Sequence, residues 1–563
     1  MSGFLYKSNF YNTNNIDRFI ESTKKLNNTN NYDYMFNPNH LIGYGFNKKR
    51  NGGILRFDNK TLVIDGNIKN KEVLFSELEN LEFKQLDQAF SLVFVVDDEV
   101  LLVRDIFGIK PLYYSFYDKD IIVSTEIKSI LEYTDNRIID DEGLSELIGM
   151  GPSHSLGKTI YKGIYELKPG NYLKFNKKGY EFKEYYKLPV YEHKLSYLNT
   201  CKLIRKIVDE SVKDKIKEKK VSSLLSGGLD STVISSILAD NCDCLDTYSI
   251  NYLNQEFKET KYEKSLDSDY TDLVSAYISS HHNNIYIDEK KIVDYLNRTV
   301  NLKDGPNMTD IDSSLLYLLE NVNLNHELTF SGECSDELFG GYPWFKESNF
   351  DNFPWIRNLE LKQNLLNSKY KERINLKEYV KKEYNKAINE APISNINKII
   401  DDERKLNYIN IKYFMLNLID RNNYISKGTN IEIMAPFCDK TLVELLYNVP
   451  LSYKSKDGIN KKLLIDSYSD ILPIEVINRK KSPFPKSNSI IYKKMIKELL
   501  VDTLKDKNTV LYKIFDIDKL NQLIEDESEI EPFYGQLMGK TSFFAYLYQI
   551  DYWFKEYKMR LED

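Results

Sequence analysis

Long apolar runs, a leader segment and clustered cysteines are all missing from this 563-residue sequence. The stretch "YFMLNLI" is among its longest apolar runs, and it is far shorter than the roughly 18 residues that cross a bilayer. The N-terminus has no basic segment followed by an apolar core, so we expect no signal peptide and no membrane partner. The five scattered cysteines form no metal-site pattern. Together these absences predict a reduced, cytoplasmic protein.

A strong excess of either charge is also missing. The 84 acidic and 77 basic residues leave a net charge of −7, which is small for this length. Proteins that bind nucleic acids broadly are more often basic, so we expect no nucleic-acid partner. A hydrophobic content of 42% and a charged content of 29% are typical of a globular protein, and the length predicts about two to four domains.

Residues 1–187 have the pattern of a β-rich domain. Short segments such as "TLVIDG", "FSLVFVV" and "VLLVRD" are rich in β-branched and aromatic residues, and Gly, Asn and Asp separate them. Several segments are apolar throughout, which indicates sheets covered on both faces. We also expect helices near Asn15–Leu26 and from Gly143 onwards.

The pattern changes after a predicted linker at residues 188–199, which contains Pro189. A stripe of apolar residues at helical spacing then predicts a helix and comprises Leu203, Ile204, Ile207, Val208, Val212 and Ile216. The strand "VSSLL", the helix "STVISSILAD" and the strand "LDTYSI" follow. Because alternating strands and helices imply a parallel sheet, residues 200–563 are predicted to form an α/β domain with many additional helices.

The turn "LLSGGLDST", residues 224–232, joins the first of these strands to its helix. Gly227 and Gly228 allow a tight turn, and the free N–H groups of the helix point into it, as in phosphate-binding sites. Asp230 would repel a bare phosphate, so its place there is understandable if it holds Mg²⁺. The hydroxyl donors around the turn are Ser226, Ser231 and Thr232.

This string resembles the signature of the PP-loop ATP pyrophosphatase superfamily, whose members transfer AMP to an acceptor oxygen and hold the departing pyrophosphate in the turn. A second motif, "FSGECSDELFGGYPWF" at residues 330–345, resembles the second signature of the asparagine synthetase family. The resemblance implies that Asp336 is a second Mg²⁺ ligand beside Asp230. It also implies that Glu333 is catalytic and moves a proton from the attacking amine, while Gly332 lets adenosine lie against the backbone.

Three later segments also resemble this family: "IEIMAPFCDKTLVELLYNVP", "KDGINKKLLID" and "INRKKSPFPKS". The second segment places Lys461 at the family's catalytic lysine, where it would neutralise charge on pyrophosphate, and Lys454 is expected to assist. The resemblance implies ATP and Mg²⁺ as cofactors. The expected ATP and pyrophosphate contacts are Leu224, Ser226, Gly227, Gly228, Asp230, Ser231, Ile250, Gly332 and Lys454.

The N-terminal segments "VLLVRDIFGIKPLYYS" and "TIYKGIYELKPGNYLKF" resemble the family's glutaminase domain, which implies an Ntn-hydrolase αββα sandwich. The family opens with "MCGI", whereas this chain opens with "MSGF", so Ser2 stands at the nucleophile's place. The family's "NGEIYN" is "DGNIKN" here. Asp65 puts an acceptor-only carboxylate where an oxyanion needs a donor, next to Gly66, and Asn67 removes the carboxylate that pairs with glutamine. We therefore predict a degenerate glutaminase site.

The acceptor site departs from the family as well. The family's "EVRVPFLD" carries an arginine that we expect near an acidic substrate, and Met434 occupies that place here. This change disfavours aspartate as the substrate.

The leading interpretation is a ligase that forms an amide from a small-molecule or peptide carboxylate and an amine, with AMP and pyrophosphate released, in specialised metabolism. Ring closure, as in β-lactam synthetases or lasso-peptide macrolactam cyclases, remains an alternative, although a tyrosine usually replaces Glu333 in the β-lactam branch. A catalytically silent scaffold and a tRNA-modifying enzyme are further alternatives. The sequence names neither the acid nor the amine, and a homodimer is one option for the assembly.

Overall fold

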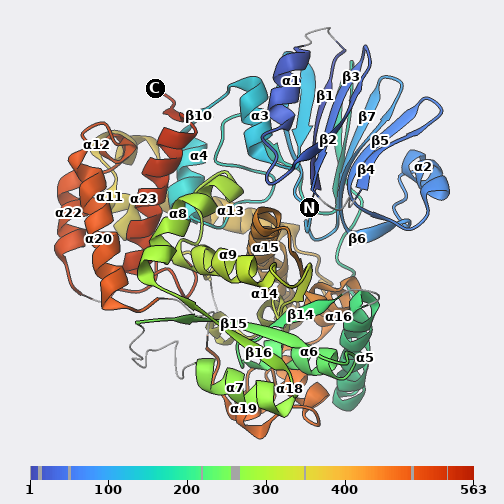
Figure 1. The fold of residues 1–563 in the computed structure, drawn as a ribbon, viewed down its shortest axis with the longest axis vertical. Coiled ribbons are helices and arrows are strands. Elements are labelled where there is room, and N and C mark those ends of the chain that lie inside the picture. The colour runs from blue at the N-terminus through green and yellow to red at the C-terminus, as the bar shows by residue number, and fades with distance from the viewer. Residues whose placement is uncertain are drawn as a thin grey trace.

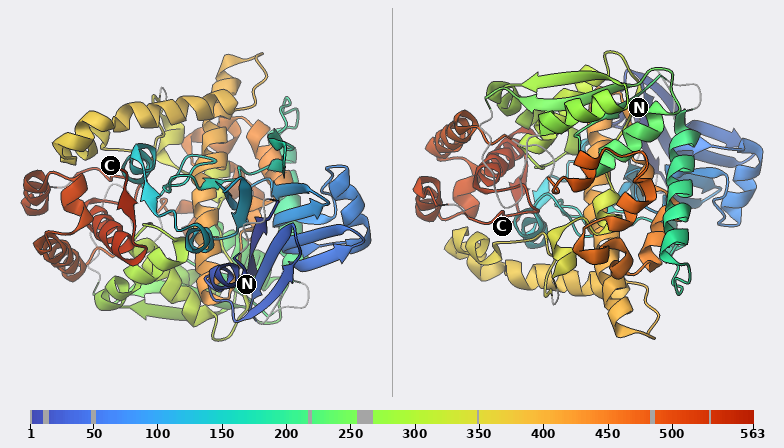
Figure 2. Two further views of the ribbon diagram at one scale, coloured as in Figure 1. Left: turned by 90° about the horizontal axis from the view of Figure 1, so that it is seen from above. Right: turned by 90° about the horizontal axis from the view of Figure 1, so that it is seen from below.

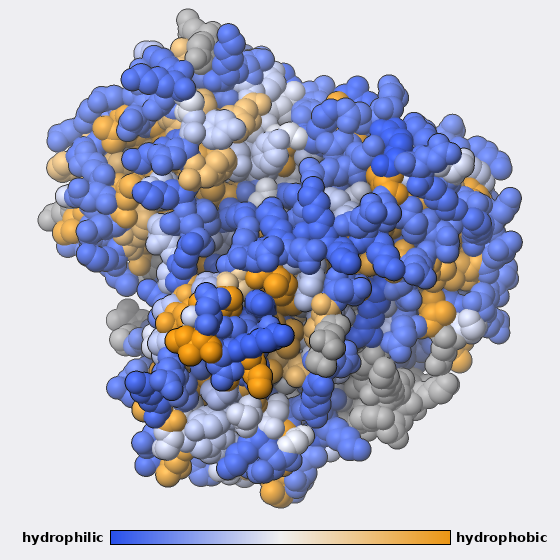
Figure 3. Space-filling view, turned by 180° about the vertical axis from the view of Figure 1, so that it is seen from behind, coloured by the Kyte–Doolittle hydropathy of each residue, from blue (hydrophilic) through white to orange (hydrophobic). Residues whose placement is uncertain are grey.

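The computed structural model describes residues 2–10, 15–47, 52–216, 220–254, 267–347, 350–482, 487–528 and 530–563. Met1 lies outside these ranges. Residues 483–486 of the predicted segment "INRKKSPFPKS" also lie outside them. Within the described residues, no helix has the length and apolar character needed to span a membrane. Hydrophilic residues cover most of the face shown in Figure 3.

The N-terminal region is a sandwich of two antiparallel six-stranded sheets (Figure 1). In spatial order, the first sheet consists of β11 (Tyr165–Glu166), β8 (Tyr113–Tyr117), β9 (Asp120–Ser124), β1 (Ser2–Ser8), β3 (His40–Phe46) and β2 (Asn31–Phe36). The second consists of β13 (Gly179–Glu184), β12 (Asn171–Asn176), β7 (Glu99–Arg104), β6 (Leu86–Val96), β5 (Lys60–Ile68) and β4 (Gly52–Phe57).

Helices complete this sandwich as outer layers. The helices α1 (Ile16–Thr23) and α3 (Ile127–Thr134) pack on the first sheet, and α2 (Lys71–Glu79) packs on the second. One apolar cluster, which includes Phe4, Tyr44 and Val93, fills the space between the sheets. Every described residue of β1 is buried, which fits a strand covered on both faces. The predicted αββα sandwich is therefore confirmed.

The predicted N-terminal helices differ from the observed ones at their ends. The helix α1 begins after Asn15, whose side chain caps it by accepting from the Arg18 N–H, and it ends at Thr23 rather than at Leu26. The expected second helix includes Gly143 within α4 (Asp141–Ser145) and continues as a π-helical turn, η1 (Glu146–Met150).

A five-stranded parallel sheet forms the centre of the C-terminal region. Its spatial order is β16 (His281–Ile287), β15 (Asp246–Tyr252), β14 (Val221–Leu224), β17 (Leu328–Phe330) and β18 (Glu432–Met434). Figure 1 shows α8 (Glu289–Lys303) and α9 (Asp310–Val322) on one side of the sheet, and α6 (Leu229–Ala239) and α7 (Asp267–Tyr277) on the other. The predicted parallel α/β arrangement is confirmed.

The remaining C-terminal chain is almost wholly helical, and Figure 2 shows these helices around the sheet. Those after β17 are α10 (Ser335–Phe339), α11 (Leu359–Leu365), α12 (Ser368–Arg373), α13 (Leu376–Glu390), α14 (Lys398–Ile409), α15 (Met415–Thr429), α16 (Lys440–Asn448), α17 (Leu451–Lys454), α18 (Lys462–Tyr468), α19 (Ile474–Asn478), α20 (Ile490–Lys505), α21 (Val510–Ile514), α22 (Ile517–Glu525) and α23 (Lys540–Glu556).

The two regions are joined by more than the chain between them. The predicted linker packs against the C-terminal helices, because Asn448 Oδ1 accepts from the Tyr191 N–H at 2.9 Å and Arg404 donates to the Tyr191 carbonyl at 2.8 Å. The helix α5 (Tyr197–Ile216) begins inside the predicted linker. Near the end of the chain, β19 (Arg560–Leu561) pairs in parallel with β10 (Ile138–Ile139) of the N-terminal region.

Candidate functional site

The predicted glycine turn lies between β14 and α6, at the carboxyl end of the parallel sheet. Gly227 has φ +64°, and a Cβ there would lie 2.5 Å from the Tyr270 backbone carbon, so this position requires glycine. The turn is braced by hydroxyl groups, since Thr232 Oγ1 donates to the Gly228 carbonyl at 2.8 Å and Ser231 Oγ lies 3.1 Å from Ser226 Oγ. This arrangement leaves the N-terminus of α6 facing the cavity described below.

The second motif packs directly against the start of α6. A Cβ on Gly332 would lie 2.7 Å from the Ser231 nitrogen, so the two motifs approach as closely as they do only with glycine there. The following short helix, α10, carries Asp336, and Ser335 Oγ donates to Asp230 Oδ1 at 2.7 Å. The sequence-predicted carboxylates are thus brought to one place from segments about 100 residues apart.

Lys461 links the two carboxylates. Its Nζ lies 2.7 Å from each carboxylate oxygen of Asp230 and 2.5 Å from Asp336 Oδ1, and the lysine is 4% exposed. Burial alone would raise the pKa of Asp336, but the ammonium groups of Lys461 and Lys481 outweigh burial and hold it at about 2. Burial likewise lowers the pKa of Lys461, and the two carboxylates more than reverse that effect.

Glu333 lines the same cavity and has two partners. One carboxylate oxygen pairs with the guanidinium of Arg421, and the other accepts from the Asn422 side-chain amide. Arg421 is buried, and its charge also interacts with that of Asp312. Both partners of Glu333 come from α15, and sequence reasoning did not identify either of them.

The structure adds a cation that the comparison at Met434 did not consider, and the view that aspartate is disfavoured stays a prediction. Met434 occupies the end of β18, where its carbonyl accepts from the Ser331 N–H at 2.8 Å, and it does not line the cavity. Arg421 supplies a cation beside Glu333 from a different element. No local pattern in the sequence marked Arg421, because an arginine on a helix is more often a solvated residue.

A continuous cavity of about 680 Å³ connects these groups. The N-terminal region contributes Pro152 and Ser153 to its wall. The sequence-predicted residues that line it are Leu224, Ser226, Gly228, Asp230, Ser231, Ile250, Gly332, Glu333, Asp336 and Lys461. Most of the predicted nucleotide site therefore faces one space.

Lys454 does not belong to that space, which corrects the expectation that it contacts pyrophosphate. It is 1% exposed, its Nζ donates to Asn407 Oδ1 at 3.2 Å, and burial lowers its pKa to about 7. Gly227 also lies outside the lining and serves the turn. Two unpredicted cations take part instead, because Lys481 pairs with Asp336 and Arg479 donates to the Ser226 carbonyl at 3.0 Å.

The predicted glutaminase residues occupy a separate, closed site in the N-terminal region. Ser2 is 2% exposed and donates its hydroxyl to Asp65 Oδ1 at 2.8 Å, and Lys110 Nζ lies 3.6 Å from the same oxygen. Gly66 is buried, whereas Asn67 is exposed at the register shift that follows in β5. The structure thus brings Ser2 and Asp65 together, and their side chains bond to each other.

An α/β domain that gathers a glycine turn and paired carboxylates at the carboxyl ends of its strands belongs with proteins that bind nucleoside phosphates there. The comparison with known families is more specific. The model of the Asparagine synthase family matches residues 203–555, more than half of the chain, and a Glutamine amidotransferase domain model matches residues 72–186. The chain belongs to the asparagine synthase family, and its ligase class is that of ATP-dependent amide ligases.

Curated relatives agree with this assignment. The chain is 34% identical over 487 residues to asparagine synthetase [glutamine-hydrolyzing] 3 of Bacillus subtilis (strain 168). The aligned residues cover 84% of this chain and 79% of the relative. It is 24% identical over 474 residues to asparagine synthetase [glutamine-hydrolyzing] 1 of the same organism, which covers 77% and 73%, respectively.

Proposed function

We propose that this protein is an AMP-forming amide ligase that activates a carboxylate with ATP and lets an amine attack it, without hydrolysing glutamine. The observation that carries the proposal is the contact of Lys461 with both Asp230 and Asp336, in the cavity that Glu333 also lines. This arrangement combines a metal-binding pair, a cation for the departing phosphates and a base within reach of one substrate space.

The residues present fit magnesium bound together with ATP. Asp230 and Asp336 supply hard carboxylate oxygens, and no cluster of three or more His, Cys, Asp or Glu occurs in the described part of the chain. Mg²⁺ in proteins is commonly held by one or two carboxylates with substrate phosphates completing its shell. Bound there, the ion would polarise the α-phosphate and neutralise charge on the pyrophosphate.

The protein's own groups would then act in sequence. The N-terminus of α6 and the hydroxyls of Ser226 and Ser231 hold the phosphates, and Lys461 offsets the negative charge that grows on the leaving pyrophosphate. Glu333, oriented by Arg421 and Asn422, accepts a proton from the amine as it attacks the activated carbonyl.

The amine is proposed to come from ammonia, a second substrate or the same molecule. Two features of the N-terminal site support this. The Ser2 hydroxyl is donated to Asp65, and a carboxylate lies where a glutaminase needs a donor for its oxyanion. We propose that such a synthetase, which does not depend on glutamine, acts in specialised metabolism.

AMP formation with a panel of carboxylic acids, in the presence of hydroxylamine as a small amine, tests the proposal. Asp230→Asn should lower AMP formation by about 100-fold, as expected for loss of a charged metal ligand worth several kcal/mol. Asp246→Asn is the matched control, because Asp246 lies at the opposite end of the sheet, bound to His281 and His326 at 2.8 Å each. Absence of AMP formation with every acid and amine would favour a silent scaffold.

A further inference from the structure

The cavity continues past Glu333 along one face of a helix. Phe414, Asn417, Leu418, Arg421 and Asn422 all line it, at the spacing that places residues on one helical face. Phe414 ends the π-helical turn η3 (Asn410–Phe414), which leads directly into α15. The seven-residue interval between Phe414 and Arg421 corresponds to about 10 Å along the axis. We call the part of the cavity between these two residues the tail compartment.

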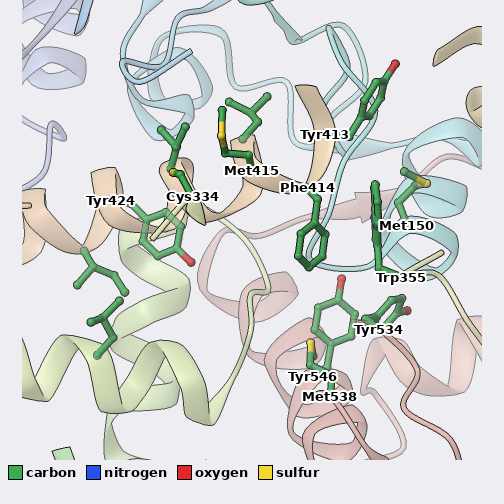
Figure 4. Packing of buried hydrophobic residues seen from close by; sticks show 14 of the residues in the cluster. Met150, Cys334, Trp355, Tyr413, Phe414, Met415, Tyr424, Tyr534, Met538 and Tyr546 are labelled. Carbon is green, nitrogen blue, oxygen red and sulfur yellow. The ribbon is translucent and has the colours of Figure 1, made fainter. Parts of the chain in front are cut away.

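Phe414, Tyr342 and Tyr534 line the far end of the tail compartment, and Trp355 packs behind Phe414. The Phe414 ring lies edge-on to Tyr342 with centroids 5.1 Å apart, and its centroid is 4.8 Å from that of Trp355. The segment around Tyr534 also lines the cavity, and the Gly535 N–H fastens it to the Trp355 carbonyl behind the wall at 2.8 Å. Figure 4 shows Phe414, Trp355 and Tyr534 grouped at this end.

The polar atoms of the two tyrosine rings already have partners inside the protein. The Tyr342 hydroxyl donates to Glu337 at 2.5 Å, and the Tyr534 hydroxyl donates to the Ile148 carbonyl at 2.6 Å. Phe414, Leu418 and the half-buried Met308 add apolar surface. Asn417 contributes one amide, and apart from it the compartment offers a ligand mainly ring faces and aliphatic carbon.

The charge at the entrance is compensated as well. Arg421 faces Glu333 and Asp312, so its guanidinium is matched by two carboxylates of the protein. A second carboxylate on the substrate, as in aspartate, would have to compete with Glu333 for Arg421, at a cost in desolvation. This arrangement favours a substrate with a single carboxylate.

We propose that the tail compartment receives the tail of the carboxylic acid, and that the acid is a monocarboxylate with a long apolar or aromatic tail. This inference rests on the proposed function. The reacting carboxylate must lie near Gly332 and Glu333 to meet the α-phosphate, and ATP fills the polar end of the cavity. The space along α15 is then left for the tail. Its length of about 10 Å equals that of about three residues of extended chain. Ammonia would need no such space.

A homologous series of acids tests the proposal on the full chain. Acetic, butyric, hexanoic, octanoic and phenylbutyric acids are compared with aspartate for AMP formation, with ATP, Mg²⁺ and hydroxylamine held constant. We expect kcat/KM to rise by roughly two- to fourfold for each methylene that enters the compartment. A flat series, or aspartate preferred over octanoic acid, would overturn the inference while leaving the proposed function intact.

Two further outcomes of the same assay are informative. If no acid supports AMP formation, the proposed function fails and this inference fails with it. If all acids are activated equally, and replacing hydroxylamine by apolar amines in a second series then speeds turnover, the compartment belongs to the amine, and the assignment to the acid is wrong.

A pair of variants separates the compartment from the aromatic core behind it. Phe414→Leu should raise KM for octanoic acid about five- to tenfold and change KM for ATP less than about twofold. Phe353→Leu is the control, because Phe353 is fully buried against Trp355 and Tyr413 and does not line the cavity. It should change neither KM. Equal effects of the two variants on KM for octanoic acid would assign Phe414 a structural role only and overturn the inference.

Discussion

The ammonium group of Lys461 donates to both carboxylate oxygens of Asp230, at 2.7 Å each, and it is also 2.5 Å from Asp336. One buried cation thus contacts both carboxylates that the proposed function assigns to magnesium, and Lys481 pairs with Asp336 as well. The lysine and the metal are therefore expected to compete for the same negative charge.

Replacing this lysine should expose that competition. Lys461→Met is expected to lower AMP formation by about 100-fold or more, because charge on the pyrophosphate is no longer offset. Added Mg²⁺ should raise the melting temperature of the variant more than that of the unaltered protein, since the carboxylates lose their internal cation. Lys462→Met, at the adjacent position and paired with Asp466, is the control. An unchanged response to Mg²⁺ would argue against a metal site at these two aspartates.

Glu333 should act on the second half-reaction only. Glu333→Gln is expected to slow amide formation by about 10²–10⁴-fold, the usual contribution of a general base. Exchange of pyrophosphate into ATP, which reports acid activation without the amine, should fall far less. Parallel assays of the two reactions measure this difference. Equal losses in both would show that Glu333 serves activation rather than attack by the amine.

Glu337 gives the protein a predictable response to pH. Burial, with a further contribution from Asp336, raises its pKa from 4.5 to about 7. The folded protein therefore holds a proton that the unfolded chain releases, so the stabilising contribution is complete below about pH 4.5 and is lost as pH rises through about 7. Glu337→Gln should remove a contribution on the order of 3 kcal/mol to this dependence. Urea unfolding from about pH 5 to pH 8 measures it, and identical pH profiles for the two proteins would contradict the assignment.

The N-terminal pair should matter for stability and not for turnover. Ser2→Ala is expected to cost about 1–2 kcal/mol of stability, because buried Asp65 loses a donor, and to leave AMP formation with hydroxylamine unchanged. Ser8→Ala is a matched control for the loss of a buried serine hydroxyl, since Ser8 Oγ donates to Asp120 at 2.7 Å in the same sheet. Ser2→Cys should not produce glutaminase activity, because Asp65 and Asn67 remain. Glutamate release that depends on residue 2 would overturn this interpretation.

The fold was predictable because its signals are local. Apolar strands in the N-terminal region and the strand–turn–helix around Gly227 follow from neighbouring residues. The approach of Asp230 to Asp336 was predictable because each lies in a motif whose sequence resembles a family signature. Nothing local marks Arg421 as the partner of Glu333, since the two lie on different elements 88 residues apart.

Arg421 was missed by sequence reasoning, whereas Lys454 was wrongly included in the site. Its place near a family-like segment suggested a phosphate contact, but the direction of a long side chain depends on packing that no short segment specifies. In the fold, Lys454 points to Asn407 and away from the cavity. Met434 shows the same dependence on packing, because it does not line the cavity, whereas Arg421 of α15 does.

Pro152 and Ser153 extend the N-terminal half into the wall of the ligase cavity. If that half releases no ammonia, these two residues still form part of the cavity in which the activated acid would meet its amine. An activated acid exposed to bulk water would be hydrolysed, and ATP would be consumed without product. The N-terminal half can therefore be under selection as a solvent shield even if it does not hydrolyse glutamine.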